Sequence, residues 1–399
     1  MRYKNLFKKT FFIAIISTFV LSFFSFAKGD EQITWTQPQG IYGGEIDEIV
    51  FSPNFSKDQT VFAGGPEGLY ISSNSGSTWK RITFTFSEGV NSIAVSPNYS
   101  QDHALVVGTK DGIFSSKDSG NNWFTMQRGV VNNYIIKVAG DSSGNYFALS
   151  FDGVLMEKAS GSDIWQQLDT FKDPLAETFT ISNNTIYVGG EQGSIYKLDL
   201  QTKNSDLMAN NLTEGAISEI KVVESTTYAS SYDNGIFISS DSRNFSNELP
   251  KEKIADLEVA GNGVIYAITS YGVLKVKDSS DWKNYDLTFN STNLSIKFSP
   301  DFSTSGLLFV TSYEYGVIKS SDFGKTFTVS NNGITNLNIT DISFSKHYAS
   351  NNAVYLTTLT NGIYTSKNSG DSFTYLGSVG NNDLTKCIEE LSNGTLLVG

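Results

Sequence analysis

The sequence predicts an all-β fold, a single β-propeller of about eight four-stranded blades. Eight glycines lie between short strand-like runs and are 37 to 46 residues apart: Gly68, Gly112, Gly153, Gly193, Gly235, Gly272, Gly316 and Gly362. A repeat of about 40 residues with four strands is the length of one propeller blade. No stretch shows a sustained helical period of apolar residues, so we expect almost no helix.

Each repeat contains four predicted strands in the same order. An apolar first strand, such as residues 48–52, is followed by a turn and a second strand, such as residues 60–64. The glycine hairpin then leads to a third strand. The fourth, outer strand carries an aromatic residue: Trp79, Trp123, Trp165, Phe245, Trp282, Phe327 or Phe373. Runs of β-branched and aromatic residues between Gly, Asn, Asp and Ser are typical of strands joined by tight turns.

Both ends of the chain carry incomplete repeats. Residues 33–37 resemble a fourth strand without its blade, and residues 384–399 begin a ninth first strand and its partner. Pairing the two ends would remove exposed strand edges. We therefore expect eight blades, with nine as the alternative if both ends join the ring. Because the last run stops within a strand, a piece of a longer protein is also consistent with the sequence.

The first 27 residues are predicted to be a secretory signal peptide. Four basic residues precede an apolar run over residues 11–26, and Ala27 ends a cleavage site of the small-x-small type. An uncleaved anchor is the alternative, although the run is shorter than the ~20 residues of a typical membrane span. We expect cleavage after Ala27, a propeller over residues 28–399, and a secreted or periplasmic monomer.

Charge and composition exclude several kinds of partner. The formal net charge is −12, and it becomes −16 when the signal peptide is removed with its four basic residues. Such a surface repels phosphate backbones and anionic lipid, so neither nucleic acid nor a membrane surface is an expected partner. Cys387 is the only cysteine, and His103 and His347 are the only histidines. We therefore expect no intrachain disulfide, no metal and no cofactor.

The most informative motif lies between the third and fourth strands. Its pattern, S-x-[DN]-x-G-x-[TSN]-[WF], occurs at residues 72–79, 116–123, 320–327 and 366–373 and is called the repeated turn motif below. The Asp or Asn accepts N–H groups of its own turn, the glycine permits positive φ, and the aromatic packs between blades. The positions predicted to be structural are Asn74, Gly76, Trp79, Asp118, Gly120, Trp123, Asp322, Gly324, Phe327, Asn368, Gly370 and Phe373.

The repeated turn motif resembles the Asp-box, also called the BNR repeat. The resemblance covers almost all of the chain after the signal peptide. It extends to exported propellers similar to the photosystem II assembly factor and the sortilin luminal domain, and also to xyloglucan-cleaving endoglucanases and sialidases. It implies a propeller fold, but these proteins differ widely in activity, so the fold does not select one.

The sequence meets the requirements of the enzymatic members poorly. Sialidases hold a substrate carboxylate with three arginines. The only arginines after the signal peptide are Arg81, Arg128 and Arg243, which are predicted to lie at the blade rim or bottom. A glycosidase of the xyloglucanase type needs two carboxylates. Glu67 or Asp111, acting with a second carboxylate, is the candidate, and this hydrolase is the alternative function.

The loops between second and third strands, with the links between blades, should share one face, called the top face. Its hairpins combine tyrosines with carboxylates, which suits sugars, apolar peptides or cationic groups. The predicted ligand-binding residues are Tyr232, Asp233, Tyr271, Tyr313, Glu314 and Tyr315. The alternative is that these tyrosines only cover the end of the central tunnel. We expect no catalytic residue, and the sequence favours a binding or assembly propeller that recognises a protein or a glycan.

Overall fold

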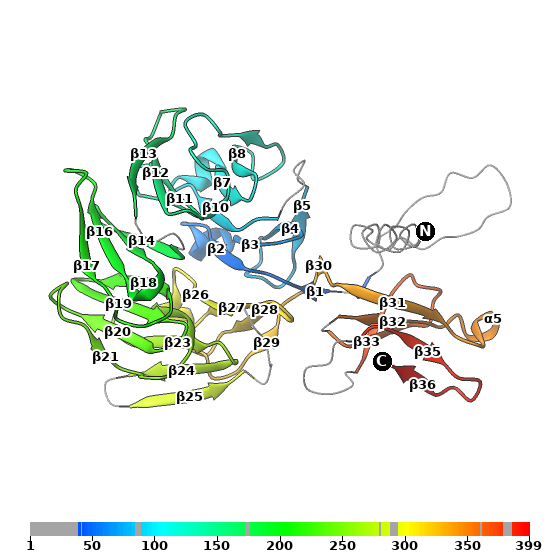
Figure 1. The fold of residues 1–399 in the computed structure, drawn as a ribbon. Helices are drawn as coiled ribbons and strands as arrows, with labels where there is room; N and C mark the ends of the chain where they lie inside the picture. The colour runs from blue at the N-terminus through cyan, green and yellow to red at the C-terminus, as the bar shows by residue number, and fades with distance from the viewer. Residues whose placement is uncertain are drawn as a thin grey trace, which may run out of the picture. The chain divides into compact units, whose positions relative to one another are not determined.

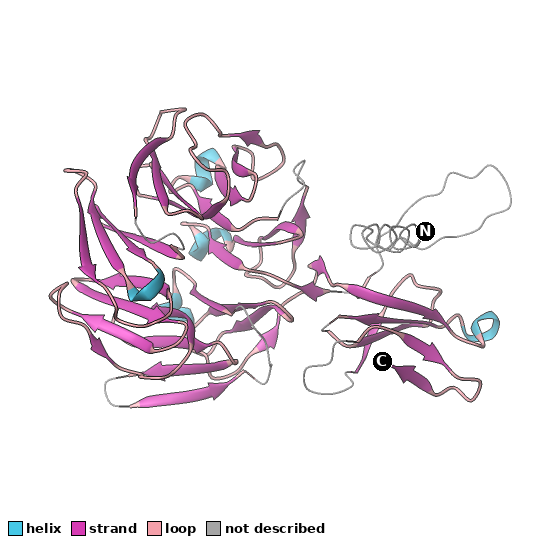
Figure 2. Ribbon diagram, in the orientation of Figure 1, coloured by secondary structure: helices cyan, strands magenta, loops and turns pink. Residues whose placement is uncertain are grey.

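The structure, a computed structural model, describes residues 39–40, 42–83, 89–171, 176–278, 281–287, 294–359, 361–377 and 385–399. Regular structure in these residues is almost entirely β-strand (Figure 2), so the all-β prediction is confirmed. Eight sheets have four antiparallel strands each, and each consists of four consecutive strands. The predicted signal peptide and the predicted strand at residues 33–37 lie outside the described residues.

The eight four-stranded sheets correspond to the eight predicted repeats. The first to fourth sheets contain β2 (Glu48–Phe51), β3 (Val61–Gly65), β4 (Gly68–Ser72), β5 (Lys80–Ile82); β6 (Ser92–Val95), β7 (Leu105–Thr109), β8 (Gly112–Ser116), β9 (Phe124–Thr125); β10 (Ile135–Gly140), β11 (Tyr146–Ser150), β12 (Val154–Lys158), β13 (Gln166–Thr170); β14 (Thr178–Ser182), β15 (Thr185–Gly189), β16 (Ile195–Asp199) and β17 (Ser205–Ala209). The fifth to eighth sheets contain β18 (Ile217–Val223), β19 (Thr226–Ser231), β20 (Gly235–Ser239), β21 (Ser246–Asn247); β22 (Ile254–Val259), β23 (Ile265–Thr269), β24 (Val273–Lys277), β25 (Trp282–Asp286); β26 (Ser295–Phe298), β27 (Leu308–Ser312), β28 (Gly316–Ser320), β29 (Thr328–Val329); β31 (Ile339–Phe344), β32 (Val354–Thr358), β33 (Ile363–Ser366) and β34 (Thr374–Gly377). Two further pairs are β1 (Gly43–Gly44) with β30 (Thr335–Asn336), and β35 (Ile388–Glu390) with β36 (Leu396–Val398).

Short helices occupy the turn between the first and second strands of four sheets. They are α2 (Phe55–Asp58), α3 (Tyr99–Asp102), α4 (Phe302–Ser305) and α5 (Tyr348–Asn351). The sequence predicts turns at these positions, and each helix is a single turn of four residues. In the first sheet, Ser52 Oγ donates to Asp58 (2.6 Å), and the helix ends at Gln59 with φ of 50°. One 3-10 turn, η2 (Glu191–Gly193), lies in the hairpin between β15 and β16.

The chain divides into two compact units, a division that was not predicted from the sequence. Residues Glu45–Ile334 contain the first seven four-stranded sheets. The other unit combines the segment that ends at Gly44 with Thr335–Gly399, and it contains the eighth sheet and both two-stranded pairs.

Within residues 45–334, the seven sheets form a closed ring. Their first strands, β2, β6, β10, β14, β18, β22 and β26, contact one another in order, and β26 also contacts β2 (Figure 1). Apolar side chains fill the seam between the first and seventh sheets, where Tyr70 and Trp79 belong to the same buried cluster as Phe309 and Val317. No strand is shared across this seam, so packing and hydrogen bonds close the ring.

One backbone contact recurs between neighbouring sheets of the ring. The N–H of Trp165 donates to the carbonyl of Arg128 (2.9 Å), which lies in the link leaving the second sheet. In the same way, the N–H of Trp79 donates to the carbonyl of Asn332 (2.7 Å), in the link leaving the seventh sheet. The first sheet therefore binds the link that leaves the seventh sheet in the same way that the third sheet binds the link that leaves the second.

The other unit contains the same contact. The N–H of Phe373 donates to the carbonyl of Gln39 (2.8 Å), and the N–H of Gln39 donates to the carbonyl of Asp371 (3.1 Å). Close by in the chain, β1 pairs in parallel with β30. Residues 39–40 therefore lie against the eighth sheet as a link from a preceding sheet would.

Candidate functional site

The four repeated turn motifs share one hydrogen-bonding scheme. In the first sheet, Asn74 Oδ1 accepts the N–H of Thr78 (2.9 Å), and Ser72 Oγ accepts the N–H of Gly76 (2.9 Å). Asp118, Asp322 and Asn368 accept the corresponding N–H groups in their own turns. Asp and Asn do the same work here, so these side chains organise turns.

Charged side chains of the first strands form a belt inside the ring. Lys137 Nζ lies 3.1 Å from Glu219 Oε2, Lys221 Nζ lies 2.9 Å from Glu258 Oε1, and Lys297 Nζ lies 3.3 Å from Asp256 Oδ2. The members, called the inner belt, are Glu48, Lys137, Glu219, Lys221, Asp256, Glu258 and Lys297. Because strand side chains alternate, the residues between them, such as Ile220 and Leu257, are buried between the sheets.

Burial and neighbouring charges set the ionisation of the inner belt. Burial raises the pKa of Glu48 to about 7, and the lysines at 137 and 297 oppose the shift only in part. Burial would also raise the pKa of Glu219, but Lys137 and Lys221 hold it below its usual range. Below pH 7, where Glu48 is mostly protonated, three carboxylates of the inner belt face three lysines. This balance suits an ion-pair network that stabilises the ring.

The inner belt was not predicted, because the first strands were expected to be apolar. A signal was present, since Glu219 and Lys221, like Asp256 and Glu258, are two residues apart on one strand face. No group of three or more His, Cys, Asp or Glu side chains is placed to hold a metal ion in the described ranges. Among those same residues, no helix is both long and apolar enough to cross a bilayer.

A cleft of about 630 Å³ lies on the top face between the fourth and fifth sheets. It is lined by the β15–β16 hairpin, the link that precedes β18 and the β19–β20 hairpin. The lining residues are Gln192, Asn211, Leu212, Thr213, Glu214, Asp233 and Asn234. Of these, only Asp233 was predicted as a ligand-binding residue.

Asp233 forms the floor of this cleft. Its carboxylate accepts hydrogen bonds from the hydroxyls of Thr213 and Ser231 and from the N–H of Gly215 (2.9 Å). Burial opposes ionisation, but these hydrogen bonds hold the pKa of Asp233 below its usual range. The ionised carboxylate therefore ties the hairpin of the fifth sheet to the link before it.

The predicted tyrosines are exposed, but their surroundings differ. Tyr232 is 44% exposed, and burial of its hydroxyl together with Glu177 and Asp256 raises its pKa. Tyr271 is 49% exposed and donates a hydrogen bond to Glu252. Burial and this carboxylate raise the pKa of Tyr271 to about 12. Tyr313 is 36% exposed on the hairpin of the seventh sheet.

Tyr315 and Glu314, on the hairpin of the seventh sheet, are half-buried, unlike the three exposed tyrosines. Tyr315 is half-buried against the apolar cluster of the sixth and seventh sheets, and its carbonyl accepts a hydrogen bond from Asn331 Nδ2 (2.6 Å). Burial in the first place, then Asp47 and Glu314, raises the pKa of Glu45 to about 7. The six predicted residues are therefore three exposed tyrosines, one cleft carboxylate, one tyrosine packed on the core, and the half-buried Glu314, whose charge acts on Glu45.

The two hydrolase candidates lie in top-face hairpins. The carbonyl of Glu67 accepts a hydrogen bond from Arg81 Nη2 (2.5 Å), and the carbonyl of Asp111 accepts one from Gln127 Nε2 (2.9 Å). Arg81 lies on the outer strand β5, at the rim of its sheet as predicted, and its side chain reaches from there to the top-face hairpin. The fourth strand carries this long side chain back along the sheet toward the hairpin.

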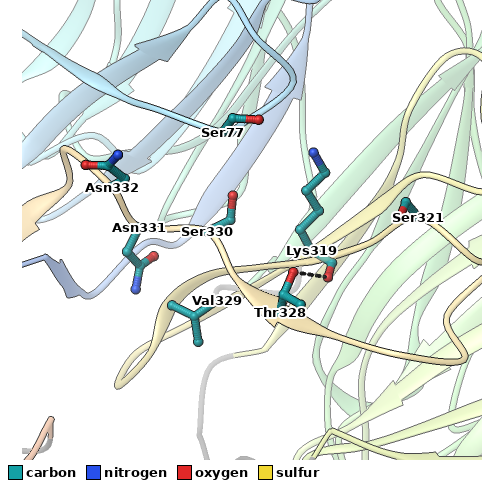
Figure 3. A pocket seen from close by; sticks show the side chains of 8 residues that line it. All are labelled: Ser77, Lys319, Ser321, Thr328, Val329, Ser330, Asn331 and Asn332. Atoms are coloured by element: carbon teal, nitrogen blue, oxygen red, sulfur yellow. Dashed lines mark hydrogen bonds between the residues drawn. The ribbon is translucent and has the colours of Figure 1, made fainter. Parts of the chain in front are cut away.

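A second cavity, of about 360 Å³, lies at the seam between the seventh and first sheets (Figure 3). Its lining residues are Ser77, Lys319, Ser321, Thr328, Val329, Ser330, Asn331 and Asn332. Lys319 Nζ donates to the carbonyl of Ser75 (2.8 Å), and burial lowers its pKa. Ser330 Oγ donates to the carbonyl of Gly76. These polar groups serve ring closure.

No protein-family model matches this chain, and no curated protein matches its sequence. Solved structures do resemble it. One is the β-propeller domain of Cps50 (Swd1) from Myceliophteria thermophila, with a TM-score of 0.55 and 11% identity over 70% of this chain and 97% of that one. Another is the computationally designed protein Ika8, with a TM-score of 0.48 and 14% identity over 77% and 95% of the two chains. A third is the extracellular domain of BT4673 from B. thetaiotaomicron, with a TM-score of 0.40 and 10% identity over 90% and 64%. The first likeness shows that the fold is a β-propeller.

Proposed function

We propose that this protein is an exported binding or assembly propeller that recognises a protein or a glycan through its top face. The observation that carries the proposal is the exposure of Tyr232, Tyr271 and Tyr313 on the hairpins of three consecutive sheets. Large exposed aromatic side chains are enriched where proteins bind partners. A fourth exposed aromatic on a top-face hairpin, Phe151, stacks on Tyr134 with ring centroids 5.0 Å apart.

The same proposal includes kinship with Asp-box propellers of the photosystem II assembly factor and sortilin type. Its support is the hydrogen-bonding scheme shared by the four repeated turn motifs. A rigid ring with variable loops needs no catalytic group to hold a partner.

The alternative is a glycoside hydrolase, and one observation bears on it. Glu45 and Asp47 share a side-chain hydrogen bond, and burial raises their pKa values to about 7 and about 6. Glycosidase carboxyl groups stand about 5 to 9.5 Å apart so that the sugar fits between them. A hydrogen-bonded pair is too close for that arrangement, which leaves Glu67 and Asp111 as the candidates.

The test uses residues 28–399 with two readouts, retention of glycans or envelope proteins and release of new reducing ends. We expect binding without cleavage, and loss of binding when Tyr271 and Tyr313 are both replaced by alanine. Phe124→Ala is the matched control, because Phe124 is 62% exposed on β9, away from the top-face hairpins. Turnover that disappears in Glu67→Gln or Asp111→Asn would instead establish the hydrolase.

A further inference from the structure

We infer that the top-face cleft between the fourth and fifth sheets binds an uncharged oligosaccharide. The inference rests on the proposed function, because it names the ligand class for one part of the top face. The cleft combines a fixed floor, a rim of unengaged polar side chains and a lining without basic residues.

Close packing of backbone and side chains fixes the floor. A Cβ atom on Gly193 would lie 2.5 Å from the backbone nitrogen of Thr213, and one on Gly215 would lie 2.9 Å from the Asp233 carboxylate. The hairpin of the fourth sheet, the following link and the hairpin of the fifth sheet therefore meet with no spare room. Thr213 and Gly215 of the link donate to Asp233 of the fifth-sheet hairpin, and the N–H of Gly193 in the fourth-sheet hairpin donates to the carbonyl of Gly215 (2.9 Å). Such a floor is preformed, so little conformational entropy is lost on binding.

Three polar side chains on the rim are available to a ligand. Gln192, Asn211 and Glu214 are exposed, and their side chains make no hydrogen bond to the described part of the chain. Gln192 and Asn211 have φ of 55° and 52°. Both residues therefore have the left-handed backbone conformation, which defines the local course of the chain at the rim. An amide both donates and accepts, which matches the paired hydroxyls of a sugar.

The charge of the lining decides between ligand classes. Lys and Arg are absent from the lining, whereas Glu214 and Asp233 are acidic, so an anionic ligand would be repelled. Three donors already engage the Asp233 carboxylate, which leaves Glu214 as the available acidic group. One available carboxylate together with two amides favours a hydroxyl-rich, uncharged ligand over a polycation. Leu212 adds an apolar contact for a sugar ring.

The experiment is calorimetric titration of residues 28–399 with cello-, manno-, galacto- and chito-oligosaccharides, and with spermidine. We expect one neutral series to bind, and Asn211→Gly, Gln192→Gly and Glu214→Gln each to weaken it at least tenfold. Glycine keeps the positive φ of the first two positions. Asn183→Gly is the matched control, since Asn183 is exposed with φ of 52° in the turn between β14 and β15, at the other end of the fourth sheet. It should bind as the wild type does.

Three outcomes would overturn the inference. Glycan binding that survives the rim variants but is lost in the Tyr271 and Tyr313 double variant would place the ligand elsewhere and leave the proposed function intact. Spermidine binding that is lost in Glu214→Gln but kept in Asn211→Gly would make the cleft a cation site. Capture of a protein partner by a chain that binds none of the oligosaccharides would also exclude this glycan site.

Discussion

The indole nitrogen of Trp79 donates a 2.7 Å hydrogen bond to the backbone carbonyl of Ser330, 251 residues away along the chain. This bond joins the first sheet to the seventh. The Trp79 ring is almost completely buried in the same seam. The chain itself does not cross the seam between the first and seventh sheets. Contacts such as that between Trp79 and Ser330 therefore determine whether the ring is closed.

Trp79→Phe should destabilise the ring by about 2 kcal/mol, because it leaves the carbonyl of Ser330 without its donor and removes buried ring surface. The measurement is denaturant unfolding of residues 28–399. Trp123→Phe is the control, since the Trp123 indole donates to Gly120 within its own turn. Equal losses in the two variants would contradict a special role for the seam.

Gly333→Ala should cost more than about 3 kcal/mol. Gly333 has φ of 98°, and a Cβ atom there would lie 1.9 Å from the carbonyl of Trp79, so strain and a clash add together. Gly263→Ala is matched in backbone, with φ of 82°, but has nothing within 4 Å, and it should cost only about 1 kcal/mol. Similar unfolding midpoints for both variants would refute the close contact.

Stability should fall as the pH rises from 4.5 to 7. The pKa of Glu48 is raised from its ordinary value of 4.5 to about 7 in the folded ring, so the folded state keeps a proton that the unfolded state has released. The stabilisation is complete below pH 4.5 and is lost by about pH 7. Glu48→Gln should remove about 2 kcal/mol of this dependence, measured as unfolding free energy at pH 5 and pH 8. A wild-type profile that is flat between pH 5 and pH 8 would contradict the raised pKa of Glu48.

Residues 45–334, expressed alone, should fold cooperatively. All seven sheets of the ring and both sides of its closing seam lie within this segment. The check is a single unfolding transition by circular dichroism and tryptophan fluorescence. A fragment that folds only when residues 335–399 are restored would contradict self-closure.

Replacing both Tyr271 and Tyr313 by alanine should abolish ligand binding and change the unfolding free energy by no more than about 1 kcal/mol, as expected for exposed loop residues. The Tyr271 hydroxyl donates a hydrogen bond to Glu252, and the loss of such an exposed contact accounts for the small expected change in stability. A collapse of the melting temperature would show instead that the tyrosines are structural.

Local turn chemistry made the repeats predictable from sequence. Asn74 and Gly76 act within their own turn, so a short motif is enough to place the strands around them. Ring closure was not predictable in this way, because neighbouring sheets look alike locally. Nothing in the sequence around Trp79 shows that Ser330 lies beside it.

The candidate site was only partly predictable for the same reason. Aromatic hairpins stand out in sequence, whereas Gln192 and Asn211 are ordinary turn residues until the fold brings them to one cleft. The charges of the first strands are visible in the sequence, but their ion pairs are not, because Lys137 and Glu219 meet across an intervening sheet.

The polypeptide chain passes directly from one sheet to the next at six of the seven seams of the ring. It does not cross the seam between the first and seventh sheets. Each sheet consists of four consecutive strands, so this seam can part while every strand stays paired. A pulling force applied at Glu45 and Ile334 would therefore open the ring at Trp79 and Ser330 before any sheet is torn.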